Sequence, residues 1–167
     1  MATQTVRELE ARADTAWANL MAQVAGLEPY LERADAPGEW TAREVLSHLL
    51  FAPDWKPGAL LASFAERDLP TIEIDAGETF LTPERRRMTL QQLVDALDGH
   101  RREVFRFLRG LSEADLARKA RVPLFKSFMG TDEIALPVFV GALWDYHVND
   151  HAGQLAKIRK AVGLPAA

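Results

Sequence analysis

Two histidines four residues apart, His147 and His151, are the side chains of this sequence best placed to do chemistry. In a helix, residues at this spacing lie on one face with their Cβ atoms about 5–6 Å apart, so both imidazoles can bind one cation. The same face is otherwise apolar, since Val140, Leu143 and Leu155 continue it at steps of three and four residues. Both rings are therefore expected to point where a core side chain would lie.

A purely structural role for this pair is the competing interpretation. The chain has four histidines, so a pair at this spacing can arise by chance, and a single inward histidine is usually a hydrogen-bonded core residue. Two on one apolar face are harder to satisfy, because each neutral ring brings a donor and an acceptor into a region with few partners. A shared metal ion would bind both acceptor nitrogens.

A third histidine, His48, is predicted on an earlier helix, which opens with the capping-box spacing of Thr41 and Glu44. It falls on or beside the apolar face of that helix. Metal sites in helix bundles are built from inward side chains of facing helices, so His48 could meet His147 and His151. Three imidazoles leave open positions on the ion, as catalytic sites do. Such a site could activate water or a thiol, or polarise a carbonyl.

Four helices are predicted to position these residues, and they define an all-α four-helix bundle that forms a single domain over residues 1–167. The first helix is expected to run from a capping box at Thr5 and Glu8 to Leu31, and the second to begin at Thr41 and to be interrupted at Pro53 and Pro57. The third is expected to begin at a capping box formed by Thr89 and Gln92, and the fourth to cover residues 135–162. Residues 68–88 show no sustained periodicity. A connection of this length suits a bundle in which two successive helices are parallel.

Composition narrows the classes of function. Of the 167 residues, 48 % are hydrophobic and 26 % charged, which is an ordinary globular balance. The net charge of −4 argues against nucleic-acid binding. The sequence has no cysteine, so a thiol would have to come from a small-molecule cosubstrate. It has no apolar run long enough to span a membrane, and its first twelve residues are too charged for a signal peptide. A cytoplasmic protein is expected.

Two stretches carry a resemblance to a known family. Residues 40–48 read Trp-Thr-Ala-Arg-Glu-Val-Leu-Ser-His, and residues 147–155 read His-Val-Asn-Asp-His-Ala-Gly-Gln-Leu. They resemble the two motifs of the DinB/YfiT-like superfamily, and the likeness covers essentially the whole chain. The resemblance implies a four-helix bundle with up-down-down-up topology and a long crossover between helices 2 and 3. It also implies a homodimer and a divalent metal ion (zinc, nickel or iron), with His48, His147 and His151 as its ligands.

The family also suggests a reaction. Bacillithiol S-transferases and the N-terminal domain of mycothiol-dependent maleylpyruvate isomerase are similar to this chain in their histidine layout. The resemblance therefore implies a metal-dependent, thiol-dependent S-transferase, or a related hydrolase or isomerase, that acts on a small molecule with a low-molecular-weight thiol as cosubstrate. The alternative is a non-catalytic stress- or damage-inducible bundle that binds a small molecule or partner. A DNA-binding module is suggested only by the family name and is opposed by the net charge.

Several polar residues have two interpretations. Many relatives have an acidic residue where this chain has Val148, so the support of the ligand rings is left open. Asn149 and Asp150 are expected to face solvent or a partner, or to orient a ligand imidazole. Gln154 could hydrogen-bond a ligand or pack between helices. His100 is expected at the boundary of the third helix's apolar stripe, with contact to the histidine cluster as the alternative.

Two groups of arginines are predicted as solvated helix faces. They are Arg85, Arg86 and Arg87, and Arg101, Arg102, Arg106 and Arg109. The alternative is that some of them bind the carboxylates of an anionic thiol cosubstrate.

Overall fold

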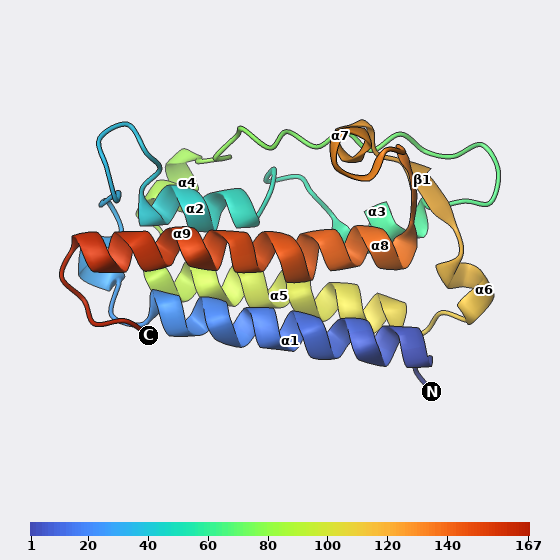
Figure 1. Ribbon diagram of the computed structural model, residues 1–167, viewed down its shortest axis with the longest axis horizontal. Helices are drawn as coiled ribbons and strands as arrows, with labels where there is room; N and C mark the ends of the chain where they lie inside the picture. The colour runs from blue at the N-terminus through green and yellow to red at the C-terminus, as the bar shows by residue number, and fades with distance from the viewer.

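Four long helical segments pack side by side in the computed structural model, which describes residues 1–167 (Figure 1). The helices are α1 (Gln4–Val24), α2 (Ala42–Leu49), α3 (Pro57–Ala62), α4 (Pro83–Arg87), α5 (Leu90–Leu108), α6 (Glu113–Leu116), α7 (Lys126–Met129), α8 (Leu136–Gly141) and α9 (His147–Ala161). Two 3₁₀ turns, η1 (Glu28–Tyr30) and η2 (Pro123–Phe125), a π-helical segment, η3 (Ala142–Tyr146), and two strands, β1 (Lys119–Arg121) and β2 (Glu133–Ala135), complete the chain. The predicted all-α four-helix bundle is confirmed.

Contacts between the helices fix their relative directions. Helix α1 is parallel to α9 and antiparallel to α5, while α2 is antiparallel to α9 and the α2–α3 stretch is parallel to α5. Between α1 and α9 the contacts are Asn19 with Asn149 and Gln23 with Arg159, and between α1 and α5 they are Glu10 with Arg109 and Asp14 with Arg101. Between α2 and α9 they are Trp40 with His151 and His48 with His147. Between the α2–α3 stretch and α5 they are Trp55 with His100 and Gly58 with Glu103. The four segments therefore run up, down, down and up, as the colours of Figure 1 also show.

Helix α1 differs from its prediction at both ends. Its N-cap is Thr3, whose side chain accepts a hydrogen bond from the backbone N–H of Val6, whereas Thr5 donates to Glu113 of α6. The helix ends at Val24, because Gly26 adopts a left-handed φ of 79°, which stops the hydrogen-bond ladder. The apolar residues beyond this point continue the core from η1 and its flanks rather than from a helix.

The second segment consists of two short helices. The predicted capping box of Thr41 and Glu44 is present at the start of α2, and the interruption predicted from Pro53 and Pro57 separates α2 from α3. Helix α2 contains eight residues, and His48 lies in its last turn. The chain leaves α2 through Phe51, which has a positive φ of 59°.

The crossover between α3 and α5 runs along the top of the molecule in Figure 1. It contains α4 and forms isolated bridges at Ala65 and Thr71 with the two ends of β1. Strand β1 pairs with β2 in an antiparallel sheet whose central pair is Ala120 and Ile134. The sequence did not predict this sheet, since three-residue strands are too short to display the alternation that identifies a strand.

The last segment is one continuous helical stretch in three parts, α8, η3 and α9. It begins after the N-cap Ala135, and Gly163 follows it with a left-handed φ of 79°, in agreement with the predicted bounds. The π-helical part lies immediately before His147, and such insertions are frequent at functional sites. None of the helices in the structure is long and apolar enough to cross a membrane.

Two apolar clusters fill the bundle and meet near the histidines. One lies around α8 and the C-terminal half of α5 and includes Leu143 and Trp144; the other lies around α2 and α9 and includes Val148 and Ala152. In the sequence, His147 lies between Leu143 and Trp144 of the first cluster and Val148 and Ala152 of the second. The structure thus places this polar ring at the boundary between the two halves of the core.

Candidate metal centre

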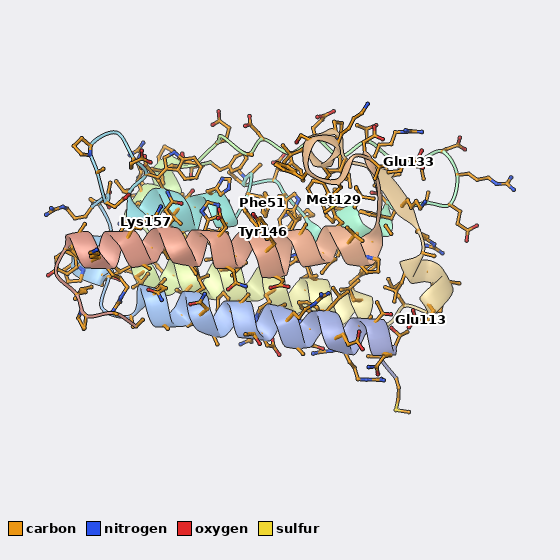
Figure 2. All side chains as sticks on the ribbon, in the orientation of Figure 1. Phe51, Glu113, Met129, Glu133, Tyr146 and Lys157 are labelled. Carbon is orange, nitrogen blue, oxygen red and sulfur yellow. The ribbon has the colours of Figure 1, made fainter.

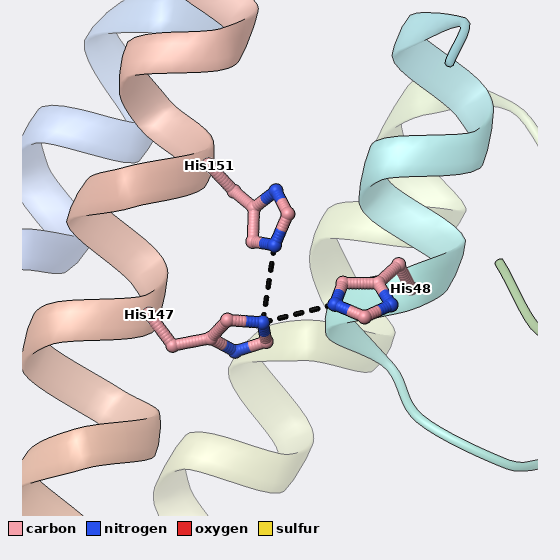
Figure 3. A group of neighbouring side chains, drawn as sticks. All are labelled: His48, His147 and His151. Carbon is pink, nitrogen blue, oxygen red and sulfur yellow. Dashed lines mark hydrogen bonds between the residues drawn. The ribbon is translucent and has the colours of Figure 1, made fainter. Parts of the chain in front are cut away.

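The structure brings together the three histidines singled out from the sequence (Figure 3). His48 projects from α2 toward His147 and His151 on α9. The Nε2 atom of His147 lies 2.9 Å from Nε2 of His48 and 3.0 Å from Nε2 of His151. One ligand atom from each residue lies within 4.8 Å of the other two. A single point between the helices is thus within reach of three imidazole nitrogens.

Hydrogen bonds at the far side of two rings determine which nitrogen carries the proton. Nδ1 of His48 lies 2.6 Å from the carbonyl oxygen of Glu78, which can only accept, so this nitrogen donates. Nδ1 of His151 lies 2.8 Å from Oε1 of Gln154 and donates to it in the same way. In the neutral rings, the Nε2 atoms of His48 and His151 are therefore unprotonated, and each directs a lone pair at the shared point.

His147 cannot satisfy both neighbours with a proton. A proton on its Nε2 could be donated fully to only one of the two facing lone pairs, and its buried Nδ1 has no hydrogen-bond partner. A divalent cation would accept all three lone pairs together. Nitrogens that bind one zinc ion at about 2.0–2.1 Å lie about 2.8–3.4 Å apart in octahedral or tetrahedral geometry, and both short Nε2 separations fall in that range. The residues present fit a divalent metal ion.

Burial keeps all three rings neutral. It lowers the pKa of His147 to about 3, with further lowering from the neighbouring His151 and His48. It also lowers the pKa of His48, against the raising effect of the bond to Glu78, and the pKa of His151, against that of the bond to Gln154. Because neutral imidazole is the form that binds metals, the site is ready for an ion at neutral pH without displacing protons.

Aromatic side chains surround the three rings. Trp40 stacks on His151 with ring centroids 6.2 Å apart, and Phe80 stacks on His48 at the same separation. The ring of Phe51, labelled beside α9 in Figure 2, lies 5.8 Å from that of His147. Such apolar walls lower the local dielectric around the ligand rings, which strengthens electrostatic interactions within the site.

A buried arginine ties the crossover to the end of α2. Nη1 of Arg85 lies 3.0, 2.6 and 3.0 Å from the carbonyl oxygens of Ser47, Phe51 and Phe80, which share its two N–H groups. Arg43 in turn donates to the carbonyl of Arg85 at 3.0 Å. The expectation of a solvated face is thus wrong for Arg85, which is 8 % exposed, and right for its exposed neighbours Arg86 and Arg87.

The polar neighbours on α9 take different roles. Gln154 orients His151, which is one of the two roles expected for it. Asn149 faces α1 instead, where it accepts from Asn19, and it donates to Asp145. Asp150 is exposed. Val148 is buried in the apolar core, so a backbone carbonyl and an amide, rather than an acidic residue after His147, support the ligand rings.

His100 stays outside the histidine cluster. Its ring packs edge-on against Trp55 with centroids 5.4 Å apart. The ring is half-buried, its Nδ1 has no hydrogen-bond partner, and burial lowers its pKa. Of its two expected positions, the edge of the apolar stripe of α5 is the one the structure shows.

Three arginines of α5 and its C-cap residue, Arg109, line a groove between α1 and α5. The groove has a volume of about 530 Å³, and its lining residues are Glu10, Asp14, Trp17, Arg101, Arg102, Phe105, Arg106 and Arg109. Arg101 pairs with Asp14 and Arg109 with Glu10. We call this surface the arginine groove. Arg102 pairs instead with Asp98 of α5 itself, and the four cations are not gathered at the histidines.

Comparison with protein families matches residues 7–155 to the DinB superfamily. The chain belongs to the DinB superfamily. Among solved structures, YfiT from Bacillus subtilis is similar to this chain, with a TM-score of 0.74 and 15 % sequence identity, covering 99 % of this chain and 91 % of YfiT. YfiT is described as a probable metal-dependent hydrolase with an unusual four-helix bundle topology. No curated protein matches this chain.

The sequence did not predict three features of the surroundings of His48, His147 and His151. These are the carbonyl of Glu78, the two phenylalanines with positive φ at 51 and 80, and the buried guanidinium of Arg85. A backbone carbonyl has no sequence signal. Phenylalanine gives no hint of a left-handed backbone, which normally selects glycine or asparagine.

Proposed function

We propose that this protein is a divalent-metal-dependent enzyme, and that hydrolysis of a small-molecule substrate is the reaction its site supports best. One observation carries the proposal. Three neutral imidazoles direct Nε2 atoms at one point, and two of them are fixed in the metal-binding tautomer by partners at Nδ1. A site of this kind would be costly to maintain as packing alone, because buried lone pairs that face each other are left without donors.

The proposed roles of the residues follow from their positions. His48, His147 and His151 would hold the ion, and Glu78 and Gln154 would keep two of the rings in the correct tautomer and orientation. A divalent ion on three protein ligands retains open positions, where it lowers the pKa of a water or thiol and polarises a carbonyl. The rings of Trp40, Phe51 and Phe80 would limit the entry of further water to the reacting groups.

Two observations favour water over a thiol as the nucleophile. Of the arginines that could have bound the carboxylates of an anionic thiol, four line the arginine groove and Arg85 is committed to backbone carbonyls, which leaves only the exposed Arg86 and Arg87 of α4. YfiT, which has the same fold, is described as a probable metal-dependent hydrolase.

Thiol-dependent S-transfer is the second candidate. The same open positions would accept a thiolate, and the histidine layout resembles that of bacillithiol S-transferases. The chain has no cysteine, so the sulfur would belong to a low-molecular-weight cosubstrate.

Elemental analysis of the purified protein tests the metal directly. We expect about one divalent ion per chain in the wild type, with zinc, nickel and iron as the candidates, and less than a tenth of that amount in His151→Ala. His100→Ala is the matched control, because His100 is half-buried but outside the cluster, and it should retain the ion. Metal-free wild type that also fails to bind added zinc or nickel would contradict the proposal and favour a non-catalytic bundle.

Activity assays then separate the two reactions. The metal-loaded protein is given ester and amide substrates alone, and in parallel an electrophilic acceptor with a panel of low-molecular-weight thiols. Turnover without thiol that disappears in His151→Ala supports hydrolysis, whereas turnover that requires a thiol supports S-transfer. A metal-loaded protein inactive in both assays would contradict both reactions while leaving the metal site intact.

A further inference from the structure

We propose that Arg85 is a positioning residue for the metal centre: it fixes the crossover segment against α2 so that Glu78 and Phe80 hold the His48 ring ready to bind the ion. The inference rests on the proposed metal site and extends it to a residue that touches none of the three ligand nitrogens.

The guanidinium of Arg85 joins two segments far apart in the sequence. On α2 and just after it, Nη1 donates to the carbonyls of Ser47 and Phe51, and more weakly to Oγ of Ser47 at 3.3 Å. On the crossover, the same atom donates to the carbonyl of Phe80 at 3.0 Å. Arg43 of α2 adds a second link between the same segments, since its Nη1 donates to the backbone carbonyls of Arg85 and Met88 at the end of α4.

The crossover held in this way supports His48 from two directions. Phe80 stacks its ring on His48 with an interplanar angle of 14°. Two residues earlier, the carbonyl of Glu78 accepts the Nδ1 proton of His48 at 2.6 Å. The tautomer and the orientation of the ligand ring thus both depend on where residues 78–80 lie, and Arg85 contacts Phe80 directly.

The backbone on both sides of the guanidinium is in an unfavourable conformation. Phe51 and Phe80 have φ values of 59° and 53°, which side chains other than glycine rarely adopt. These conformations direct one phenylalanine ring toward His147 and the other toward His48. The backbone carbonyls of Phe51 and Phe80 both accept from Arg85. One cation therefore stabilises two strained residues whose side chains line the same site.

Fold stability alone is a weak reason for this arginine. The structure gives its guanidinium no ion pair with a carboxylate, and only 8 % of the residue is exposed. A buried cation loses much of its hydration energy, and replacement of such groups by apolar side chains of similar volume is often neutral or stabilising. The carbonyls at the C-terminus of α2 offset part of this loss. A role in holding the site explains why a charge is placed here.

The test uses Arg85→Met and Arg85→Lys, with two controls. Arg86→Met changes the exposed neighbour on the same short helix. Leu116→Ala creates a cavity at α6, at the opposite end of the bundle from α2 (Figure 1), and reproduces a loss of stability without touching the site. For each protein, circular dichroism checks the fold, and competition with a chromophoric chelator gives the dissociation constant for zinc.

We expect zinc binding about 10- to 100-fold weaker in Arg85→Met, an intermediate loss in Arg85→Lys, and wild-type binding in both controls. In the metal-free protein, nitrogen NMR should show the Nδ1–H tautomer of His48 in the wild type and a tautomer mixture in Arg85→Met. If Arg85→Met does not fold, Arg85→Lys carries the comparison, because it keeps the charge and can reach one or two of the carbonyls.

Two results separate this inference from the proposed function. Wild-type zinc affinity in the Arg85 variants, or a loss no larger than in Leu116→Ala, would overturn the positioning role while the metal site stands. Failure of the wild type to bind any divalent metal would overturn the proposed function. The His48 tautomer in the metal-free proteins would then decide on Arg85 by itself, since an unchanged tautomer in Arg85→Met contradicts the inference.

Discussion

Polar side chains are arranged in opposite ways in two seams of the bundle, one between α2 and α9 and the other between α1 and α5. In the arginine groove, guanidinium and carboxylate groups pair at the surface, and the Arg109 side chain remains 54 % exposed. At the histidine centre, three neutral rings are largely withdrawn from water with their lone pairs facing one another. In exposed ion pairs, each charged group has an oppositely charged partner and water around it, and such pairs contribute little to the free energy of unfolding. Buried acceptors without donors need an additional partner, and this requirement distinguishes a binding site from a solvated face.

Metal removal should produce the largest difference between the two seams. An ion present at about a thousand times its dissociation constant stabilises the folded state by about 4 kcal/mol. For a chain of this size we therefore expect chelation to lower the melting temperature by about 8–16 °C. Differential scanning calorimetry with and without chelator measures the shift. His151→Ala should show no shift, and an equal shift in both proteins would place the ion elsewhere.

Acid should destabilise the metal-free protein through the histidine centre. The pKa of His147 is about 3 in the folded protein against about 6.5 when unfolded, so its contribution is complete above pH 6.5 and is lost as the pH falls toward 3. At pH 5.5 the loss from His147 alone is on the order of 1 kcal/mol. The lowered pKa values of the other three histidines act in the same direction.

Urea unfolding of the chelator-treated protein at pH 7.5 and 5.5 checks this expectation. His147→Gln should be less sensitive to the change of pH than the wild type, whereas Arg109→Ala in the arginine groove should be equally sensitive. The same pH dependence in His147→Gln and wild type would show that this ring is not buried in its neutral form.

Two helix caps give a smaller and more selective comparison. Thr41 caps α2, which carries His48, and Thr89 caps α5, which carries no proposed ligand. Replacing either by alanine should cost about 1 kcal/mol in the free energy of unfolding. We expect only Thr41→Ala to weaken zinc binding as well, because α2 has eight residues and depends strongly on its cap. Equal zinc affinity in the two variants would mean that packing alone holds His48 in place.

The smallest effect is expected in the arginine groove. Arg109→Ala removes an exposed ion pair with Glu10 and should change the free energy of unfolding by less than about 1 kcal/mol. The dissociation constant for zinc should be unchanged. A change in zinc affinity, measured by the same chelator competition, would show that the two seams are coupled through the bundle.

The sequence predicted the elements that carry strong local signals. The capping boxes at Thr41 and Thr89 are present, and the interruption at Pro53 and Pro57 is where it was expected. The prediction was wrong at the first helix, where Thr3 rather than Thr5 is the cap and Gly26 ends the helix before Leu31. Threonines two residues apart offer equivalent caps in the sequence, and tertiary contacts decided between them.

Periodicity and the positions of prolines and caps by themselves determined a helical bundle and placed His48, His147 and His151 on inward faces. The two motifs identified the family. Only the tertiary structure showed that the three Nε2 atoms converge, that Glu78 and Gln154 select two of the tautomers, and that Arg85 is buried among carbonyls. The reason is physical: burial, tautomer and backbone strain arise from segments distant in the chain, whereas caps and apolar spacing are properties of neighbouring residues.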